Sequence, residues 1–335
     1  MSIRHTLAGA AALAGLALVL SGCSGAIDTG AGGASEGGAP AEAQVPESCS
    51  EDGAMISVLL PNQVNPYYVA MKEGFEEAAA EHGMTAEVQI ADDDDAQQLA
   101  QAEAALQKSP CALALNPVKS EPAAAIVRAA NDAGVPVFTV NVIVDEDALA
   151  AQGASIVQYL GADNKAGGAQ VGEKAAEDFG DDALRVGLVT EPDEVPVVIR
   201  DEGFEEAISS HPDAEIVAEV DGNVKATDSL DVTGAMLQGN PDMNAIFAST
   251  GPAAQGALEA VIASGRDVKV YGFCAPEVQT TDSYPACVAQ EPADYGARVV
   301  EQIALFVDGE SVDPEILRPL KMFSDGETPA PGEVG

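Results

Sequence analysis

The strongest constraint on the fold is a regular alternation of short apolar runs with stretches of helical periodicity, from Met55 to Val307. The apolar runs are nearly continuous, which is typical of parallel strands that are buried on both faces. Several helical stretches end at a glycine, such as Gly83 or Gly265, as helices commonly do. This βα alternation predicts parallel sheets covered by helices on both sides, the doubly wound α/β architecture.

The alternation divides into two sets, and a folded part of about 280 residues is long enough for two lobes. Strands are expected at 55–60, 86–90, 112–115, 135–140 and 156–160, then at 185–190, 215–220, 245–249, 268–273 and 286–289. Helices are expected at 67–82, 96–108, 121–133, 166–179, 197–210, 226–238, 253–263 and 294–307. We therefore predict an α/β protein with two doubly wound parallel-sheet lobes joined by crossover strands.

The beginning of the chain has the features of an export signal. Two basic residues precede an apolar stretch at 7–19, which has the length of a signal-peptide core and is too short to span a bilayer. The following Leu20-Ser21-Gly22-Cys23 resembles the bacterial lipobox, although an ordinary secretory signal with a chance cysteine is an alternative. We predict a lipoprotein signal peptide at 1–22 and an extracytoplasmic protein anchored to the cell membrane by lipidated Cys23.

Residues 23–47 are rich in Gly, Ala and Ser and show no periodicity, so they are expected to form a lipidated flexible tether. The folded part follows this tether. We expect an N-terminal lobe made of residues 48–162 plus 291–312. A C-terminal lobe is expected from residues 163–290 plus 313–328.

The chain has 55 acidic and 15 basic residues, a formal net charge of −40. Such a surface repels nucleic acid, so no nucleic-acid partner is expected. The acids are dispersed except for the block Asp92–Asp95. A calcium loop is an alternative for this block, but the glycine and the terminal glutamate of a calcium-binding hand are missing. A solvated loop between a strand and a helix is the preferred interpretation.

Four cysteines remain besides Cys23, and an even number in an exported protein favours two disulfides. We favour Cys49–Cys111, because both residues precede strands that would be parallel neighbours. We also favour Cys274–Cys287, because one residue ends a strand and the other begins the next. A zinc site is the alternative, but there is no CxxC and the three histidines are scattered. No metal and no cofactor are predicted.

In a doubly wound fold, ligands bind outside the carboxyl ends of the strands, and two lobes can face each other across a cleft. Most residues expected at these ends are uncharged hydrogen-bonding side chains, which suit the hydroxyls of a ligand. The predicted ligand-binding residues are Asn65, Tyr67, Tyr68, Asn116, Asn141, Glu191, Thr250 and Gln290. Arg200 is instead expected to pair with a carboxylate at the start of its helix.

Tyr67 and Tyr68 could both belong to the core. Tyr68 shares a helical stripe with Met71 and Phe75, and Tyr67 is displaced from that stripe by about 100°. We therefore expect at least one of the two to line the cleft. Catalysis has little support, because no nucleophile elbow and no Ser-His-Asp or Cys-His set is visible. The protein is predicted not to be an enzyme.

From Met55 to Phe323 the chain resembles the periplasmic ribose/galactose-type sugar-binding proteins of ABC importers. The resemblance rests on an ordered series of motifs: "NPYYVAMKEGFEEAA", "ALNPVKSEPAAAIVRAANDAGVPVFTVN", "GADNKAGGAQVGEKAAE", "IRDEGFEEAI", "NPDMNAIFAST", "VKVYGFCA" and "ACVAQEPADYGARVVEQIALFVDGE". It implies that Asn65, Tyr67, Tyr68, Asn116 and Gln290 stand where the family binds its ligand.

Other positions of the family pattern differ in this chain. The Asp-Arg pair after the fourth strand is Asn141-Val142, and a binding Arg corresponds to Val198. The second-lobe aromatic corresponds to a position near Val224, and an Asn and an Asp correspond to Thr250 and Cys274. Charge-assisted bonds are about twice as strong as neutral ones, so a sugar would bind weakly here or the solute would be less polar.

These observations predict a lipid-anchored, monomeric substrate-binding protein of an ABC importer. Its ligand would be a small neutral solute, a sugar or a polyol, which it delivers to an ABC permease. One alternative is a receptor that passes its signal to a membrane sensor or a chemoreceptor. Another is an importer receptor for a less polar solute that is not a sugar.

Overall fold

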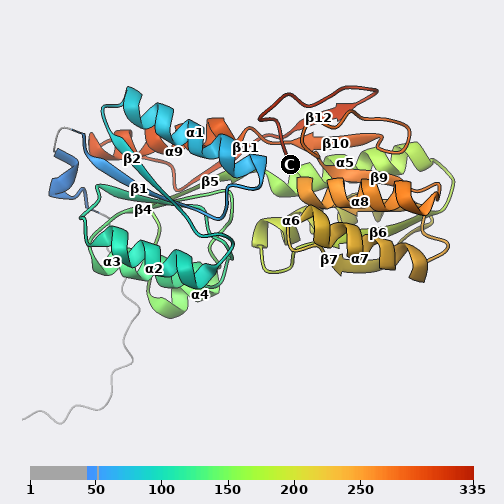
Figure 1. The fold of residues 1–335 in the computed structure, drawn as a ribbon, viewed down its shortest axis with the longest axis horizontal. Helices are drawn as coiled ribbons and strands as arrows, with labels where there is room; N and C mark the ends of the chain where they lie inside the picture. Colours follow the sequence, from blue (N-terminus) through green and yellow to red (C-terminus); the bar gives the residue numbers. More distant parts are fainter. Residues whose placement is uncertain (1–43, 51–52) are drawn as a thin grey trace, which may run out of the picture. The chain divides into compact units, whose positions relative to one another are not determined.

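The computed structural model describes residues 44–50 and 53–335. The predicted signal peptide at 1–22, the predicted lipidation site Cys23 and most of the predicted tether lie outside the described residues. In the described part, the strands form two separate six-stranded sheets with helices packed on both faces of each (Figure 1).

The first sheet is parallel throughout, with the strand order β11-β5-β4-β3-β1-β2. Its strands are β1 (Met55–Leu60), β2 (Thr85–Ile90), β3 (Ala112–Leu115), β4 (Val137–Val140), β5 (Gln158–Ala162) and β11 (Glu315–Arg318). The order 2-1-3-4-5 within it is that of a doubly wound sheet, in which the order reverses beside the first strand.

The second sheet repeats the same connection order, as β12-β10-β9-β8-β6-β7. Its strands are β6 (Leu184–Thr190), β7 (Ala214–Asp221), β8 (Ala245–Ala248), β9 (Lys269–Phe273), β10 (Ala286–Ala289) and β12 (Lys321–Ser324). Only β12 is antiparallel to its neighbour in this sheet. The prediction of two doubly wound lobes is therefore confirmed.

Helices on opposite faces of each sheet enclose separate apolar clusters. On the first sheet, α1 (Pro66–Glu81) and α9 (Pro292–Val307) pack against each other on one face. The other face is covered by α2 (Asp95–Leu106), α3 (Ala123–Asp132) and α4 (Glu146–Gln152). The helices of the second sheet are α5 (Asn164–Phe179), α6 (Val195–Ile208), α7 (Ala226–Gly239) and α8 (Gly251–Ser264), which pair as α5 with α6 and α7 with α8.

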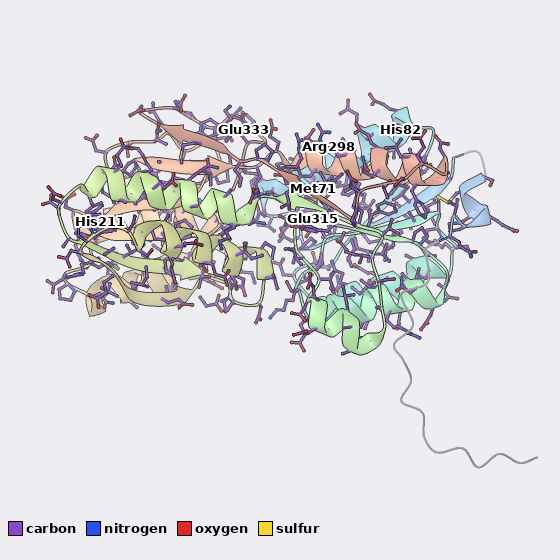
Figure 2. All side chains as sticks on the ribbon, turned by 180° about the vertical axis from the view of Figure 1, so that it is seen from behind. Met71, His82, His211, Arg298, Glu315 and Glu333 are labelled. Carbon is purple, nitrogen blue, oxygen red and sulfur yellow. A yellow bond between two sulfur atoms is a disulfide. The ribbon has the colours of Figure 1, made fainter. Side chains whose placement is uncertain are left out.

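Strand β1 explains why the apolar runs in the sequence are continuous. Ile56 and Leu60 belong to the cluster beneath α1 and α9, whereas Leu59 belongs to the cluster beneath α2 and α3. Because successive side chains of a strand point to opposite faces, both parities must be apolar when both faces are covered. Met71 of α1 is likewise fully buried in the interior of the first lobe (Figure 2).

Within residues 53–335 the chain passes between the sheets three times: from β5 to α5, from β10 to α9, and from β11 to β12. The third passage corrects the predicted lobe boundaries. The sequence predicts residues 313–328 in the second lobe, but β11 pairs with β5 in the first sheet. Only β12 lies in the second sheet, so the passage falls between Arg318 and Lys321.

Both predicted disulfides are present, Cys49–Cys111 and Cys274–Cys287. The first lies at the amino ends of the neighbouring strands β1 and β3, and the second joins the end of β9 to β10. Among residues 44–50 and 53–335, no group of three or more His, Cys, Asp or Glu is arranged to hold a metal ion. No helix in that part of the chain is long and apolar enough to cross a membrane.

The acidic block Asp92–Asp95 spans the connection from β2 to α2 and the first residue of α2. Asp94 caps α2 by accepting a hydrogen bond from the Gln97 backbone N–H at 2.9 Å. Asp93 accepts a hydrogen bond from the Asn62 side chain at 2.7 Å. These carboxylates are therefore used in a strand-to-helix loop, as the preferred interpretation expects.

Candidate ligand-binding site

A small cavity lies where strands of both sheets end. It is lined by residues that follow β1 and β4 of the first sheet and β6, β7, β8 and β10 of the second, together with Gly335: Asn65, Tyr67, Tyr68, Asn141, Glu194, Pro196, Arg200, Val224, Thr250, Gln290 and Gly335. The cavity measures about 20 Å³, which is room for about one water molecule. In this conformation the two lobes are thus closed onto each other at the site.

The start of α1 positions the two tyrosines. The Asn65 side chain caps the helix by accepting a hydrogen bond from the Tyr67 backbone N–H at 3.0 Å, and Pro66 is the first helical residue. This places both aromatics in the first turn. Their rings meet edge to face, with centroids 5.4 Å apart. Only 3% of Tyr67 and 4% of Tyr68 is exposed, so both belong to the core and both line the cavity.

The Tyr67 hydroxyl connects the two lobes. Its oxygen lies 2.9 Å from Asn141 Oδ1 and 3.1 Å from Gln290 Oε1. A phenol carries one proton and can donate to only one of these oxygens at a time, and the second amide can donate its NH₂ to the phenol oxygen. Burial raises the pKa of Tyr67 well above its ordinary value, which keeps the hydroxyl protonated.

Asn141 has an unusual backbone that directs its amide into the site. Its φ is 64°, in the left-handed region that asparagine tolerates better than other non-glycine residues. The Tyr159 hydroxyl donates to the Asn141 carbonyl oxygen at 2.9 Å. This hydrogen bond holds the residue after β4, so that its side chain faces Tyr67.

Arg200 of α6 is fixed against the floor of the cavity. Its Nε donates to Asn164 Oδ1 at 2.8 Å and one NH₂ group donates to the Ser249 carbonyl at 2.9 Å. The guanidinium lies 3.9 Å from the centroid of the Phe273 ring, a cation–π contact. The expected pairing with a carboxylate is wrong, since Arg200 has no ion pair among residues 44–50 and 53–335. Burial lowers its pKa, and the guanidinium stays charged.

A second cavity of about 210 Å³ adjoins the first and shares Tyr68, Glu194 and Val224 with it. Burial, and then the neighbouring Glu191 carboxylate, raise the pKa of Glu194 to about 8, against the opposing effect of Arg200. Burial, and then Asp221, raise the pKa of Glu191 to about 7. These two carboxyls can therefore change charge near neutral pH while facing the cleft.

Three of the predicted ligand residues have other roles in this conformation. Asn116 is fully buried outside the cavity, where its amide nitrogen lies 3.4 Å from Met71 Sδ. Glu191 lines the second cavity and not the first. Thr250 lines the first cavity, but its hydroxyl accepts a hydrogen bond from the Ala253 N–H as the cap of α8. Ligand contact of these residues stays a prediction.

The sequence interpretation missed part of the cavity lining, namely Glu194, Pro196, Arg200 and Gly335. The rule of strand ends could have found Glu194, because it follows β6 by four residues. Val224, at the place of a second-lobe aromatic, lines the cavity with a φ of 47°. No local signal in the sequence indicates that Gly335 returns to the site, because the contact depends on long-range packing.

Donors and acceptors on uncharged side chains dominate this arrangement. Tyrosine hydroxyls, the three amides of Asn65, Asn141 and Gln290, the Glu194 carboxyl and an arginine surround a space bounded by aromatic rings. Amides and hydroxyls can both donate and accept, and aromatic faces suit the apolar face of a ring. Such a site fits a small polar molecule enclosed between two lobes.

Comparison with known proteins agrees with this class of two-lobed binding protein. The model of the periplasmic binding protein domain matches residues 56–311. The ribose import binding protein of Haemophilus influenzae is 32% identical over 265 residues, covering 78% of this chain and 88% of that protein. The ribose import binding protein of Bacillus subtilis is 30% identical over 262 residues, covering 77% of this chain and 83% of that protein.

Among solved structures, an ABC transporter periplasmic solute-binding protein from Actinobacillus succinogenes with bound D-allose aligns with a TM-score of 0.73. It is 25% identical, and the match covers 81% of this chain and 97% of that one. The chain belongs to the periplasmic binding protein family, in its ribose/galactose-type group. Proteins of this family are extracytoplasmic binding proteins.

Proposed function

We propose that this protein is the substrate-binding component of an ABC importer and binds one small neutral solute, a sugar or a polyol, between its lobes. The observation that supports this most is the Tyr67 hydroxyl shared by Asn141 and Gln290. A ligand hydroxyl beside the same groups would join the phenol in this set, because each amide has further donors and acceptors. The similar proteins, two ribose import binding proteins and a solute-binding protein with bound D-allose, support a sugar as the ligand.

Binding would involve opening and closing of the lobes. The cavity of about 20 Å³ is too small for a monosaccharide, since ligand pockets commonly measure about 300–1,000 Å³. The three chain passages between the sheets can act as the hinge. The open form would receive the solute, and closure would present the loaded receptor to an ABC permease.

We also propose that Cys23 carries the lipid anchor and that residues 24–47 tether the folded part to the membrane as a monomer. The supporting observation is the sequence Leu20-Ser21-Gly22-Cys23 after an apolar stretch. Two acyl chains suffice for stable anchoring. A Cys23→Ala variant should lose metabolic labelling with palmitate and appear in the soluble fraction; a variant that stays labelled and membrane-bound would contradict the anchor site.

A thermal-shift screen followed by calorimetry tests the proposed ligand class. The screen should contain D-ribose, D-allose, myo-inositol, nucleosides and amino acids. A ligand at about 100 times its Kd stabilises the folded state by about 2.7 kcal/mol. We expect a shift with a sugar or polyol and its loss in Tyr67→Ala. A shift only with charged amino acids would contradict a neutral solute.

A further inference from the structure

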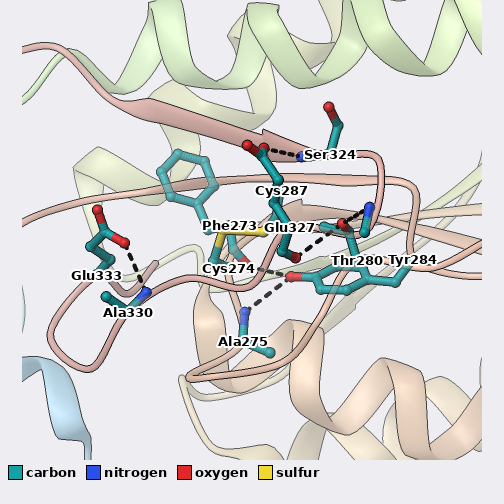
Figure 3. Close-up of a disulfide and its surroundings, with 11 residues drawn as sticks. Phe273, Cys274, Ala275, Thr280, Tyr284, Cys287, Ser324, Glu327, Ala330 and Glu333 are labelled. Atoms are coloured by element: carbon teal, nitrogen blue, oxygen red, sulfur yellow. Dashed lines mark hydrogen bonds between the residues drawn. A yellow bond between two sulfur atoms is a disulfide. The ribbon is translucent and has the colours of Figure 1, made fainter.

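The segment 330–335 returns to the cleft through a tight turn. The Glu333 N–H donates to the Ala330 carbonyl at 2.9 Å, and Pro331 and Gly332 occupy the two central positions, with Gly332 at a φ of 90°. Proline followed by a glycine of positive φ is the requirement of a type II turn. The Glu333 carboxylate accepts from the Ala330 N–H at 2.8 Å and pairs with Lys321 at 2.6 Å, which fixes the turn beside the Cys274–Cys287 disulfide (Figure 3).

After the turn, the backbone joins the end of β10. Gln290 N–H donates to the Val334 carbonyl at 2.8 Å, and Val334 N–H donates to the Gln290 carbonyl at 3.1 Å. Only 2% of Val334 is exposed, and its side chain belongs to the apolar cluster that contains Tyr67 and Phe273. The backbone of Gln290 is therefore held by this segment, while its side chain faces Tyr67.

Gly335 reaches the ends of two further elements. Its N–H donates to the Cys274 carbonyl at 3.0 Å, just after β9, and its carbonyl accepts from the Gly251 N–H at 3.0 Å, at the first residue of α8. A side-chain carbon at Gly335 would lie 2.3 Å from the Cys274 nitrogen and 2.5 Å from a Phe273 carbon. Only glycine fits this position without displacing the segment.

The contacts place the segment on the ligand-facing edge of the second lobe. It covers the carboxyl ends of β9 and β10 and the start of α8, and Gly335 lines the cavity with Thr250 and Gln290. The carboxyl ends of parallel strands are where a doubly wound lobe binds its ligand. The segment therefore occupies space that these strand ends would otherwise present to a solute.

We propose that residues 330–335 form a fixed wall of the ligand site that limits the size of the solute accepted by the second lobe. This inference rests on the proposed binding function. Four main-chain hydrogen bonds to Gln290, Cys274 and Gly251 and the buried Val334 side chain hold the segment in place. Part of the second-lobe boundary of the site is therefore backbone. The side chains at the neighbouring strand ends have other roles, because Cys274 is in a disulfide and Thr250 caps a helix.

Two variants test the wall through ligand selectivity. Deletion of 330–335 removes it, and Gly335→Val displaces its end without shortening the chain. The matched control is Gly234→Val in α7, where a side-chain carbon meets nothing within 4 Å. Calorimetry would compare D-ribose, D-allose and the larger disaccharide sucrose, and circular dichroism would check that each variant is folded.

We expect Kd for the monosaccharide preferred by the unmodified protein to rise at least tenfold in both variants, and its preference over sucrose to fall at least tenfold. Gly234→Val should keep both values. Kd values and preferences within twofold of those of the unmodified protein in both wall variants would overturn the proposal. If the deletion does not fold, Gly335→Val alone decides.

Hydrogen exchange of the ligand-free protein separates this proposal from the proposed function. The Gly251 and Gln290 amides should exchange at least tenfold faster in Gly335→Val or in the deletion variant than in the unmodified protein, because each loses its acceptor in the segment. If no sugar binds but exchange accelerates, the ligand class fails, while residues 330–335 remain the fixed boundary of the cavity. If exchange is unchanged, the wall is overturned whatever the protein binds.

Discussion

The hydroxyl of Tyr67 lies 3.1 Å from Oε1 of Gln290, so the first helix of one lobe meets the end of the last parallel strand of the other. The same hydroxyl lies 2.9 Å from Asn141 Oδ1. A single phenol therefore satisfies buried amides on both sides of the cleft. The closed arrangement of the lobes depends on groups that a polar ligand would also use.

Replacing Tyr67 with Phe should weaken both lobe closure and ligand binding. The change leaves the Asn141 and Gln290 amides buried without their shared partner, which costs about 1–3 kcal/mol. We expect a lower Tm and a five- to tenfold higher Kd for the sugar found in the screen. This change in Kd corresponds to a loss of roughly 1–1.4 kcal/mol of binding free energy. Tyr271→Phe is the control, because its hydroxyl contacts Asp178 away from the cavity. Equal effects of the two changes would contradict a special role for Tyr67.

Arg200→Lys should destabilise the second lobe although it keeps the charge. Lysine cannot reproduce the planar donation to Asn164 and Ser249 or the stacking on Phe273. Loss of hydrogen bonds to such a buried charged group costs about 1.5–3 kcal/mol in urea unfolding. Arg128→Lys at an exposed position of α3 is the control, since its surface pair with Asp132 contributes less than about 1 kcal/mol. A loss under 0.5 kcal/mol, roughly the scale of a surface change, would contradict this account.

Because of Glu194, the free energy of unfolding should fall as pH rises. Its folded pKa is raised from 4.5 to about 8, so its contribution to stability is fully present below pH 4.5 and is lost as pH rises to about 8. Glu194→Gln should therefore match the unmodified protein at pH 4 and exceed it at pH 8.5, by roughly 1–3 kcal/mol after a discount for partial exposure.

Melting curves from about pH 4 to 8.5 measure this difference. The control is Glu202→Gln, at an exposed position of α6, the helix that Glu194 precedes. If Glu194→Gln has the same pH profile as the unmodified protein, the Glu194 carboxyl is not desolvated in the cleft.

The amino-acid sequence predicts the fold of each lobe, but it does not predict the contacts between the two lobes. Continuous apolar strands and glycine-terminated helices depend on local periodicity, so β1, β3 and β10 have the predicted bounds. The short helix α4 and the strands β11 and β12 were missed. The strand β11 is partly exposed and alternates in burial, so it lacks the continuous apolar run used to find the others.

The site was partly predictable for the same reason. Strand ends located Asn65, Tyr67, Asn141 and Gln290, since topology brings these ends together. The rule does not tell which polar side chains turn into the cavity. Asn116 lies outside the cavity against Met71, and the Thr250 hydroxyl caps α8.

The two disulfides should stabilise the protein to different extents. Cys49–Cys111 joins residues 62 apart and Cys274–Cys287 joins residues 13 apart. By the chain-entropy relation, removing the disulfide that closes the longer loop lowers the free energy of unfolding by about 4 kcal/mol, and removing the other lowers it by about 3 kcal/mol. In calorimetry, the Cys→Ala pair that removes Cys49–Cys111 should therefore have a lower Tm than the pair that removes Cys274–Cys287. A larger loss at Cys274–Cys287 would indicate that this bridge acts through native packing around Phe273 and Gly335 and not through loop closure.

Val224 should be a position where substitution stabilises the protein. Its φ of 47° lies in the left-handed region, and Asn223 before it has a φ of 50°. A β-branched residue is strained there, because left-handed backbone costs about 1–2 kcal/mol for residues with a side chain and less for asparagine. Val224→Asn should therefore raise the free energy of unfolding by about 1 kcal/mol.

The matched control for this change is Val198→Asn, at a residue that is 37% exposed on α6 and has ordinary helical backbone. It should be neutral or slightly destabilising, because asparagine forms helices less well. Val224 also lines both cavities, so the new amide would add a donor and an acceptor beside Tyr68 and Glu194. A gain in stability together with a lower Kd for the screened sugar is the expected pair of results. A loss of stability would show that the valine side chain contributes more through packing than its backbone costs.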